Sequence, residues 1–589
     1  MLWGLSFFGW LTVAVIITKA VLMIKTRLPG DIIGLGIIVF LLLVGALPTE
    51  MALSCFSSTS VVLVGALFVL ATALVHSGLV HWMTSHLLGR PKDLSKALLQ
   101  IMMPASIMSA FISSAPVMAL MLGTVKMWAR RRGFMPSKLL LPLSYATTLG
   151  GVCTLIGTTP NLVVADIYNS ETGQSLGFTS TTLPGLFCLV VGMAIIIALQ
   201  RLLPVRKCPE ETFESSADYT VELVIPADNE HIGETVEDAK LQNVDGGSLV
   251  EIVRFDSEII SPVPNDEFLL GNDHLVYSGD INSILQLRNT HGLVNANHIV
   301  FNTKDVKERK RKLQMATIDF ASPLIGKCMR DISFEDRHGV VLVAVARGGE
   351  RIKEIPRDIV LRPGDTLLLE GTKLLPEKFS GELNFFDSVA LPQDPGKTLG
   401  ATIILAAMVL LAVTGVMPLL NSCLLATVAM LVIRCLSIEQ LQNAINWKLL
   451  MVFAGSVCIG KAITHTGVSQ AVSDGITLMA NTSPLISLVI ICTAATFITE
   501  FTSSASAAAI FAPIGITIAN SLGVNPVTFC VAIMISVSST FATPMGSETN
   551  TFVYGPGGYR FIDYIRIGLP MNIILLIANI FITTIVYPL

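Results

Sequence analysis

The chain has 589 residues, 52% of them hydrophobic, and a mean hydropathy of +0.68, which excludes an ordinary soluble enzyme of this size. Its charges are unevenly distributed, because residues 205–395 hold 33 of the 43 acidic and 21 of the 39 basic residues. The net charge of −4 sums over residues in a membrane and residues in water, so it does not indicate a binding partner. This pattern predicts membrane-spanning segments on both sides of a soluble insert.

Several apolar runs reach the roughly 20 residues that a helix needs to cross a bilayer. They cover residues 2–24, 31–49, 60–80, 181–203, 398–417, 447–463 and 568–588. Lys25 and Arg27 follow the first run without a small-residue cleavage site, which predicts a retained span rather than a signal peptide. Arg130–Arg132 and Arg201–Lys207 lie beside spans, and such basic clusters favour the cytoplasm. The insert is therefore expected to begin in the cytoplasm.

A polar motif occurs once in each hydrophobic half. Phe111–Ala115 (FISSA) returns as Phe501–Ala505 (FTSSA), and a Gly-x-x-x-Asn segment follows each, at Gly157–Asn161 and Gly546–Asn550. The spacing from the second Ser to the Gly is 43 residues in the first half and 42 in the second. Polar, helix-breaking clusters at matched positions of two halves are typical of the binding site of a secondary transporter.

The residue types of this motif fit a site for an anion together with a small cation. A broken helix directs backbone N–H groups and the positive end of its dipole at an anion, while unwound carbonyls and hydroxyls can replace the hydration shell of a cation. Small residues also permit close helix packing, which is the alternative interpretation, but two clusters in register favour a site. The predicted substrate-binding residues are Ser113, Ser114, Thr158, Asn161, Ser503, Ser504, Thr549 and Asn550.

The insert contains a repeat of its own. Ile232 precedes the Gly271-Asn-Asp motif by 39 positions, and Ile325 precedes Gly364 of a Pro-Gly-Asp motif by 39 positions. β-Branched and alternating residues bounded by turn signals predict strands at 248–254, 274–277, 340–346 and 366–370. We therefore expect two α+β modules, at 205–300 and 301–395, between a first membrane repeat at 1–204 and a second at 396–589.

These motifs resemble known families. The insert pattern is similar to the TrkA C-terminal domain, the C-terminal lobe of the regulator-of-potassium-conductance fold. Thr499–Ala505 resembles the T-E-F-x-S-N-T hairpin signature of the divalent anion:sodium symporter family, within the ion transporter superfamily. Tyr554–Phe561 and Ser137–Asn161 are similar to stretches of its bacterial members that carry two TrkA-C domains.

The resemblance implies an α-helical polytopic inner-membrane protein of bacteria. Its fold would be an inverted-repeat transporter with re-entrant hairpins and broken helices, acting as a homodimer by an elevator motion. It would be neither an enzyme nor a nucleic-acid-binding protein, and it would use no cofactor beyond Na+ as coupling ion. Small regulatory ligands are expected at the TrkA-C modules. The sodium ligands implied are Ser109, Ser113, Ser114, Gly157, Thr499, Thr502, Ser504 and Gly546.

Two departures from the family pattern bear on the substrate and the coupling ion. Both tips read Ser-Ser-Ala instead of Ser-Asn-Thr, so each lacks an amide and a hydroxyl. This favours a compact anion such as sulfate or a related oxyanion or sulfonate, with C4-dicarboxylates next. Glu548 replaces a common Gln and is the candidate proton site of an alternative, proton-coupled anion transporter. A potassium-system subunit is a remote alternative, because no T-V-G-Y-G filter is present.

Overall fold

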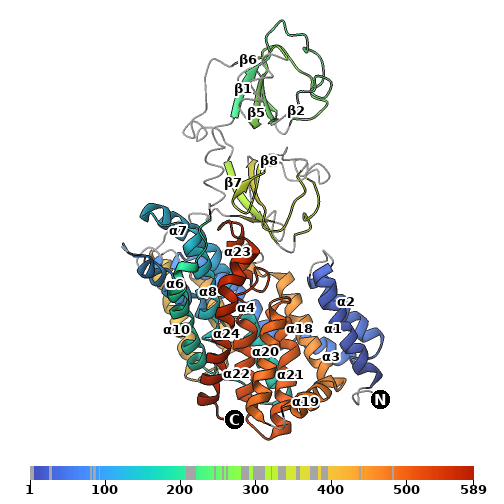
Figure 1. Ribbon diagram of the computed structural model, residues 1–589, viewed down its shortest axis with the longest axis vertical. Helices are drawn as coiled ribbons and strands as arrows, with labels where there is room; N and C mark the ends of the chain where they lie inside the picture. The colour runs from blue at the N-terminus through green and yellow to red at the C-terminus, as the bar shows by residue number, and fades with distance from the viewer. Residues whose placement is uncertain are drawn as a thin grey trace. The chain divides into compact units, whose positions relative to one another are not determined.

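The computed structural model forms two compact units, which we describe separately (Figure 1). The first comprises Met1–Val205, Ser388–Val553 and Arg560–Leu589, and the second Arg206–Asp387 with Tyr554–Tyr559. The structure describes residues 6–25, 30–79, 82–83, 88–91, 93–206, 220–244, 247–254, 258–260, 263–279, 291–295, 312–319, 322–328, 340–352, 359–371, 383–385, 395–436, 440–441, 444–480 and 483–589.

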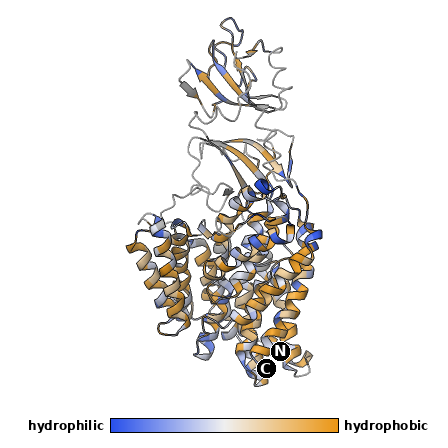
Figure 2. Ribbon diagram, turned by 90° about the vertical axis from the view of Figure 1, so that its left-hand side faces the viewer, coloured by the Kyte–Doolittle hydropathy of each residue, from blue (hydrophilic) through white to orange (hydrophobic). Residues whose placement is uncertain are grey.

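The first unit is helical, and apolar residues make up much of its helices (Figure 2). Its first half contains α1 (Phe7–Lys25), α2 (Gly30–Leu43), α3 (Thr49–Phe56), α4 (Thr59–His76), α6 (Leu94–Phe111), α7 (Ser114–Arg132), α8 (Ser137–Val152), α9 (Thr159–Thr172) and α10 (Thr182–Ala198). Its second half contains α15 (Pro395–Val413), α16 (Leu419–Val432), α18 (Trp447–His465), α19 (Val468–Met479), α20 (Pro484–Thr499), α21 (Ser504–Leu522), α22 (Pro526–Ser538), α23 (Glu548–Tyr554) and α24 (Phe561–Val586).

Several of these helices have the length and composition of membrane spans. Within the described ranges five pass this test, and a sixth is added if the bent pair Leu449–His465 and Val468–Met479 counts as one span. The two parts of that pair meet at 70°. Shorter apolar helices, such as α10 and α22, accompany them. The structure is therefore that of a helical polytopic membrane protein.

The repeated motifs lie where helices are interrupted. In the first half α6 ends at Phe111, and extended backbone at Ile112 and Ser113 leads into α7. In the second half α20 ends at Thr499, and Ser503 caps α21 by accepting a hydrogen bond from the Ser506 amide at 3.3 Å. Because Ser is a favoured N-cap residue, the Ser pair in each motif marks the start of a new helix.

A second interruption follows in each half. The chain leaves α8 after Val152 and re-enters a helix, α9, at Thr159; it leaves α22 after Ser538 and re-enters α23 at Glu548. Each non-helical stretch contains the Gly of the Gly-x-x-x-Asn motif, and each following helix contains its Asn. The predicted helix breaks are therefore present at both copies of this motif.

The second unit contains two antiparallel sheets. The first has the strand order β2-β3-β5-β1-β6, with β4 paired to β3, and the second has the order β11-β7-β10-β8-β9. The first sheet consists of β1 (Thr220–Val224), β2 (Asn243–Val244), β3 (Gly247–Arg254), β4 (Glu258–Ile260), β5 (His274–Gly279) and β6 (Val294–Asn295). The second consists of β7 (Lys312–Ile318), β8 (Val340–Arg347), β9 (Glu350–Arg351), β10 (Thr366–Gly371) and β11 (Leu383–Phe385). The four strands predicted for the insert are confirmed as β3, β5, β8 and β10.

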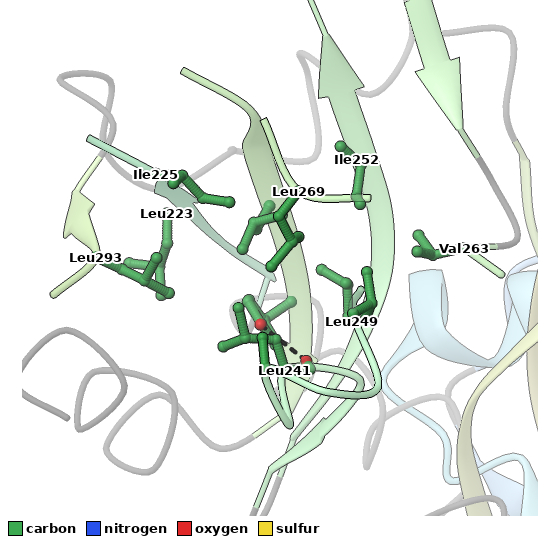
Figure 3. Packing of buried hydrophobic residues seen from close by; sticks show 12 residues of the cluster. Leu223, Ile225, Leu241, Leu249, Ile252, Val263, Leu269 and Leu293 are labelled. Atoms are coloured by element: carbon green, nitrogen blue, oxygen red, sulfur yellow. Dashed lines mark hydrogen bonds between the residues drawn. The ribbon is translucent and has the colours of Figure 1, made fainter. Parts of the chain in front are cut away.

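Each sheet packs its apolar face into a small core. Figure 3 shows the core of the first sheet, in which Leu223, Leu249, Ile252 and Leu269 come together with little or no exposed surface. The buried Tyr277 hydroxyl donates to the Leu241 carbonyl at 2.9 Å, so its polar end is satisfied inside this core. A corresponding cluster that includes Leu342, Leu361 and Leu367 fills the second sheet.

The repeated Asp of the insert holds a turn in both sheets. Arg254 Nε lies 3.0 Å from Asp273 Oδ1, and Arg347 Nε lies 2.7 Å from Asp365 Oδ1. Each Asp also accepts a backbone N–H three residues before it, and both carboxylates are buried. The hydrogen bond and charge of Asp273 hold the pKa of Arg254 above its ordinary value. The Asp that ends both the Gly-Asn-Asp and the Pro-Gly-Asp motif therefore has a structural explanation in both sheets.

Candidate functional site

The first half-site joins the tip at Ser114 to the break before α9. The Thr154 hydroxyl donates to the Ala110 carbonyl, and Asn161 Nδ2 donates to the Thr154 carbonyl at 2.9 Å. Ser114 Oγ lies 3.5 Å from the Gly157 carbonyl, at the outer limit of a hydrogen bond. The three contacts tie the end of α6 and the start of α7 to the unwound stretch between α8 and α9.

The second half-site repeats these contacts with the equivalent residues. The Thr543 hydroxyl donates to the Glu500 carbonyl at 2.8 Å, and Asn550 Nδ2 donates to the Thr543 carbonyl at 3.0 Å. Ser504 Oγ lies 3.5 Å from the Gly546 carbonyl. The sequence repeat therefore corresponds to a repeated network of hydrogen bonds, and each motif Asn holds its helix break in shape.

The first half-site is compact and still contains polar atoms without a partner. Ser109 and Ser114 share a hydrogen bond of 2.9 Å. A Cβ placed on Gly151 would lie 2.8 Å from Ser114 Oγ and 2.8 Å from Thr158 Cγ2, so these residues meet around one small space. Thr158 Oγ1 and Asn161 Oδ1 are buried without a hydrogen-bond partner. These oxygens remain available to a ligand.

The structure brings residues of the two halves together through α8. Ser144 donates to Asn550 Oδ1 at 2.7 Å, and Thr148 shares a hydrogen bond of 2.9 Å with Thr549. All four side chains are buried. Asn550 is therefore fully engaged, whereas Asn161 has an open acceptor, so the two motif Asn residues are not equivalent.

The remaining predicted residues of the tips are also located. Ser113 and Ser503 are half-buried at the starts of α7 and α21, and the Ser503 hydroxyl donates to Ser506 Oγ at 2.8 Å. Thr499 is fully buried and donates to the Val537 carbonyl at 2.9 Å. Thr502 donates to the carbonyl four residues before it, within its own turn. These hydroxyls keep lone pairs that a sodium ion could use.

Lys19 is a polar residue at the second tip that the sequence interpretation missed. Its side chain is 7% exposed, and Nζ donates to Ser506 Oγ at 2.8 Å. No carboxylate among the described residues lies within 4 Å of this ammonium group. The sequence could have identified Lys19, because it is the one charged residue in the run 2–24 and an ionisable residue inside a span usually has a function.

The two acidic residues near the second half-site have opposite environments. Glu500 is 6% exposed, and its Oε1 accepts hydrogen bonds from the Ala542 amide at 3.0 Å and from Asn572 Nδ2 at 2.6 Å. Glu548 is exposed at the first position of α23. The assignment of Glu548 as a proton site assumed a buried position, whereas its side chain is exposed in this structure; the assignment itself stays a prediction.

Comparison with known proteins identifies the family. A family model described as citrate transporter matches residues 14–514. The chain is 28% identical to the uncharacterized transporter sll0640 of Synechocystis, over 98% of this chain and 97% of that protein. It is 28% identical to the uncharacterized transporter YfbS of Escherichia coli, over 96% and 97%. It is also 26% identical to sodium/sulfate cotransporter 1 of Chlamydomonas reinhardtii, over 55% of this chain and 38% of that protein.

The match extends over most of both membrane halves. It agrees with the predicted resemblance to anion:sodium symporters of the ion transporter superfamily, and the relatives carry transporter names. The first copy of the hydrogen-bond network lies within the matched residues, and Thr543 and Asn550 of the second copy follow the end of the match. We conclude that this chain belongs to the citrate transporter family and is a membrane transporter of that family.

Proposed function

We propose that the protein imports a small anion by secondary active transport coupled to sodium. The observation that carries this proposal is the pair of matched helix breaks with a buried, uncompensated ammonium group at one of them. Two helices, α7 and α21, begin at the paired Ser motifs, and their N-terminal dipoles favour negative charge. Lys19 adds a full positive charge in the first turn of α21.

The ammonium group and the helix N-terminus repel each other in the absence of an anion. A buried charge costs several kcal/mol of desolvation unless it is paired, and Lys19 has a hydroxyl as its hydrogen-bond acceptor. An anion bound beside Ser503 and Ser506 would neutralise both positive groups. The neutral hydroxyls of the first half-site would complete the coordination without adding charge.

The substrate we favour is sulfate or a related oxyanion or sulfonate, with a C4-dicarboxylate next. Serine side chains at both tips reach less far than asparagine, which suits a compact anion. The name of sodium/sulfate cotransporter 1 from Chlamydomonas supports the same class of substrate and sodium as the coupling ion. By family resemblance we further propose a homodimer in a bacterial inner membrane, with an inverted repeat and an elevator motion.

Uptake into proteoliposomes tests the proposed function. Labelled sulfate, succinate and taurine are supplied with an inward gradient of sodium or of choline, and sulfate with sodium is expected to give the highest rate. Ser114→Ala and Ser504→Ala each remove a hydroxyl from a tip, and each is expected to weaken uptake ten- to hundredfold, because a hydrogen bond to a charged group is worth about 1.5–3 kcal/mol. Absence of sodium-driven uptake of all three compounds would refute the proposal.

For the insert we propose a regulatory role, with two TrkA-C-like modules that bind a small ligand. Tyr554–Tyr559 belongs to the compact unit of these modules, although it directly follows residues of the membrane unit. A Cβ on Gly364 would overlap the Tyr554 ring, and a Cβ on Gly555 would overlap the Thr317 methyl group. These close approaches lie within the unit of the modules, and the chain itself connects them to the half-site, because α23 carries Asn550 and ends at Tyr554.

We expect Gly555→Val to uncouple the insert from transport. The added side chain cannot fit against Thr317, so the segment after α23 would leave the second sheet. The measurement is the sulfate uptake rate with and without dialysed and undialysed cell extract inside the vesicles. Wild-type protein should respond severalfold, and the variant should not. Gly177→Val, where the nearest atom to the new Cβ is 3.5 Å away, serves as the control. An equal response of Gly555→Val and wild type would contradict this role.

A further inference from the structure

The two half-sites differ most at one position, where the first has Ala110 and the second has Glu500. The backbone carbonyl of each accepts the same threonine hydrogen bond, from Thr154 and Thr543 respectively. The first half builds this helix break with no carboxylate, so the repeated network does not need one. Glu500 therefore requires a different explanation from the neighbouring hydroxyls.

The two carboxylate oxygens of Glu500 have different partners. Oε1 accepts hydrogen bonds from the Ala542 amide and from Asn572 Nδ2. Oε2 is buried and accepts no hydrogen bond. In the part of the chain that the structure describes, no Lys, Arg or His nitrogen lies within 4 Å of Glu500. This buried carboxyl group thus has one open oxygen and no basic side chain beside it among the described residues.

Threonine side chains lie beside Glu500 Oε2, around Gly546. A Cβ on Gly546 would lie 3.2 Å from Glu500 Oε2, 3.1 Å from Thr543 Oγ1 and 3.0 Å from Thr540 Cβ. Thr540 Oγ1 is buried without a hydrogen-bond partner, and so is Oδ1 of Asn572, whose Nδ2 donates to Glu500. The absence of a side chain at Gly546 leaves a small cradle bordered by Glu500 Oε2, Thr543 Oγ1 and the Thr540 side chain.

We propose that Glu500 Oε2 is the anionic ligand of a sodium-binding site, with Thr540 Oγ1 as a second ligand at the Gly546 cradle. Oxygen ligands with a single carboxylate suit a small, hard, monovalent cation. Among the described residues no group of three or more His, Cys, Asp or Glu side chains forms a divalent metal site. The inference deepens the proposed sodium-coupled transport, on which it rests, by assigning the charge that holds the ion.

The test is sodium-dependent thermal stabilisation of the purified full-length protein. The melting temperature is measured against NaCl concentration, with choline chloride keeping the ionic strength constant. Glu500→Gln retains an oxygen that can accept both N–H donors, removes the charge and replaces the other oxygen with an NH2 group that cannot bind a cation. We expect it to weaken the apparent sodium affinity ten- to hundredfold, as for the loss of a charged ligand. Glu171→Gln, which changes a carboxylate bonded to Thr464 on another helix, should leave the affinity unchanged.

A purely structural role predicts wild-type sodium affinity in Glu500→Gln, and that result would overturn the proposal. If this variant does not fold, Thr540→Val removes the second ligand at nearly constant volume and should weaken sodium affinity by at least severalfold; unchanged affinity overturns the proposal. If Glu500→Gln loses a pH response of the wild-type protein but keeps its sodium affinity, Glu500 binds a proton rather than sodium. That result also overturns the proposal. The sodium site and the proposed function can fail independently. If sodium stabilises the protein through Glu500 but none of the tested anions is transported, the site is supported and the proposed function is refuted.

Discussion

Lys19→Met is expected to raise the KM for sulfate uptake ten- to hundredfold and to leave the melting temperature unchanged or higher. The variant removes the buried ammonium group, whose Nζ donates to Ser506 Oγ at 2.8 Å. In the proposed site this group also attracts the anion, and a hydrogen bond to a charged group is worth about 1.5–3 kcal/mol. Methionine fills a similar volume without the desolvation cost of an ammonium group, so stability should not fall. Initial uptake rates at increasing sulfate concentration measure the effect.

Two further lysine variants separate charge from packing at this position. Lys19→Arg keeps the positive charge and should recover most of the sulfate affinity. Lys126→Met changes another buried lysine, located 12 residues into α7 and therefore about 18 Å along the helix from its start, and should leave KM unchanged. A KM for Lys19→Met equal to that of the wild type, with a lower melting temperature, would show that Lys19 only joins α1 to α21.

The second large effect is expected at Gly157, where alanine should abolish uptake. Its Cβ would overlap the backbone carbonyl of Gly151 and lie 2.7 Å from the Gly151 Cα, and backbone atoms cannot move aside as a side chain can. Overpacking of this kind costs about 1–3 kcal/mol and displaces the Ser114 contact with the Gly157 carbonyl. Sulfate uptake and the melting temperature report the two consequences.

Gly546→Ala, at the equivalent position of the second half, is expected to lower the stability of the fold much less than Gly157→Ala. The nearest atoms to its Cβ belong to side chains, at 3.0–3.2 Å, and a shift of a few tenths of an ångström accommodates it. We expect near-normal melting temperature with weakened sodium affinity, because the methyl group fills the cradle beside Glu500. Equal loss of stability in Gly157→Ala and Gly546→Ala would contradict the asymmetry between the two half-sites.

The sequence alone identified the features that depend on composition and local order. Apolar runs predicted the helical membrane unit, and alternating residues predicted strands such as β3 and β10 in the insert. The repeated Ser-Ser and Gly-x-x-x-Asn motifs located both helix breaks, because serine caps and glycine act through their own backbone. The family was recognised from the same motifs, and the match over residues 14–514 confirms it.

Tertiary structure decided which polar groups face one another, because those pairings join residues hundreds of positions apart. Ser144 meets Asn550, and Lys19 meets Ser506, across 406 and 487 positions of the chain. The sequence placed the carboxylate of interest at Glu548, since that residue lies inside the motif. Packing instead buries Glu500 against Ala542 and Asn572 and leaves Glu548 exposed. Burial and the loss of a counter-charge are properties of the folded environment, and no local pattern encodes them.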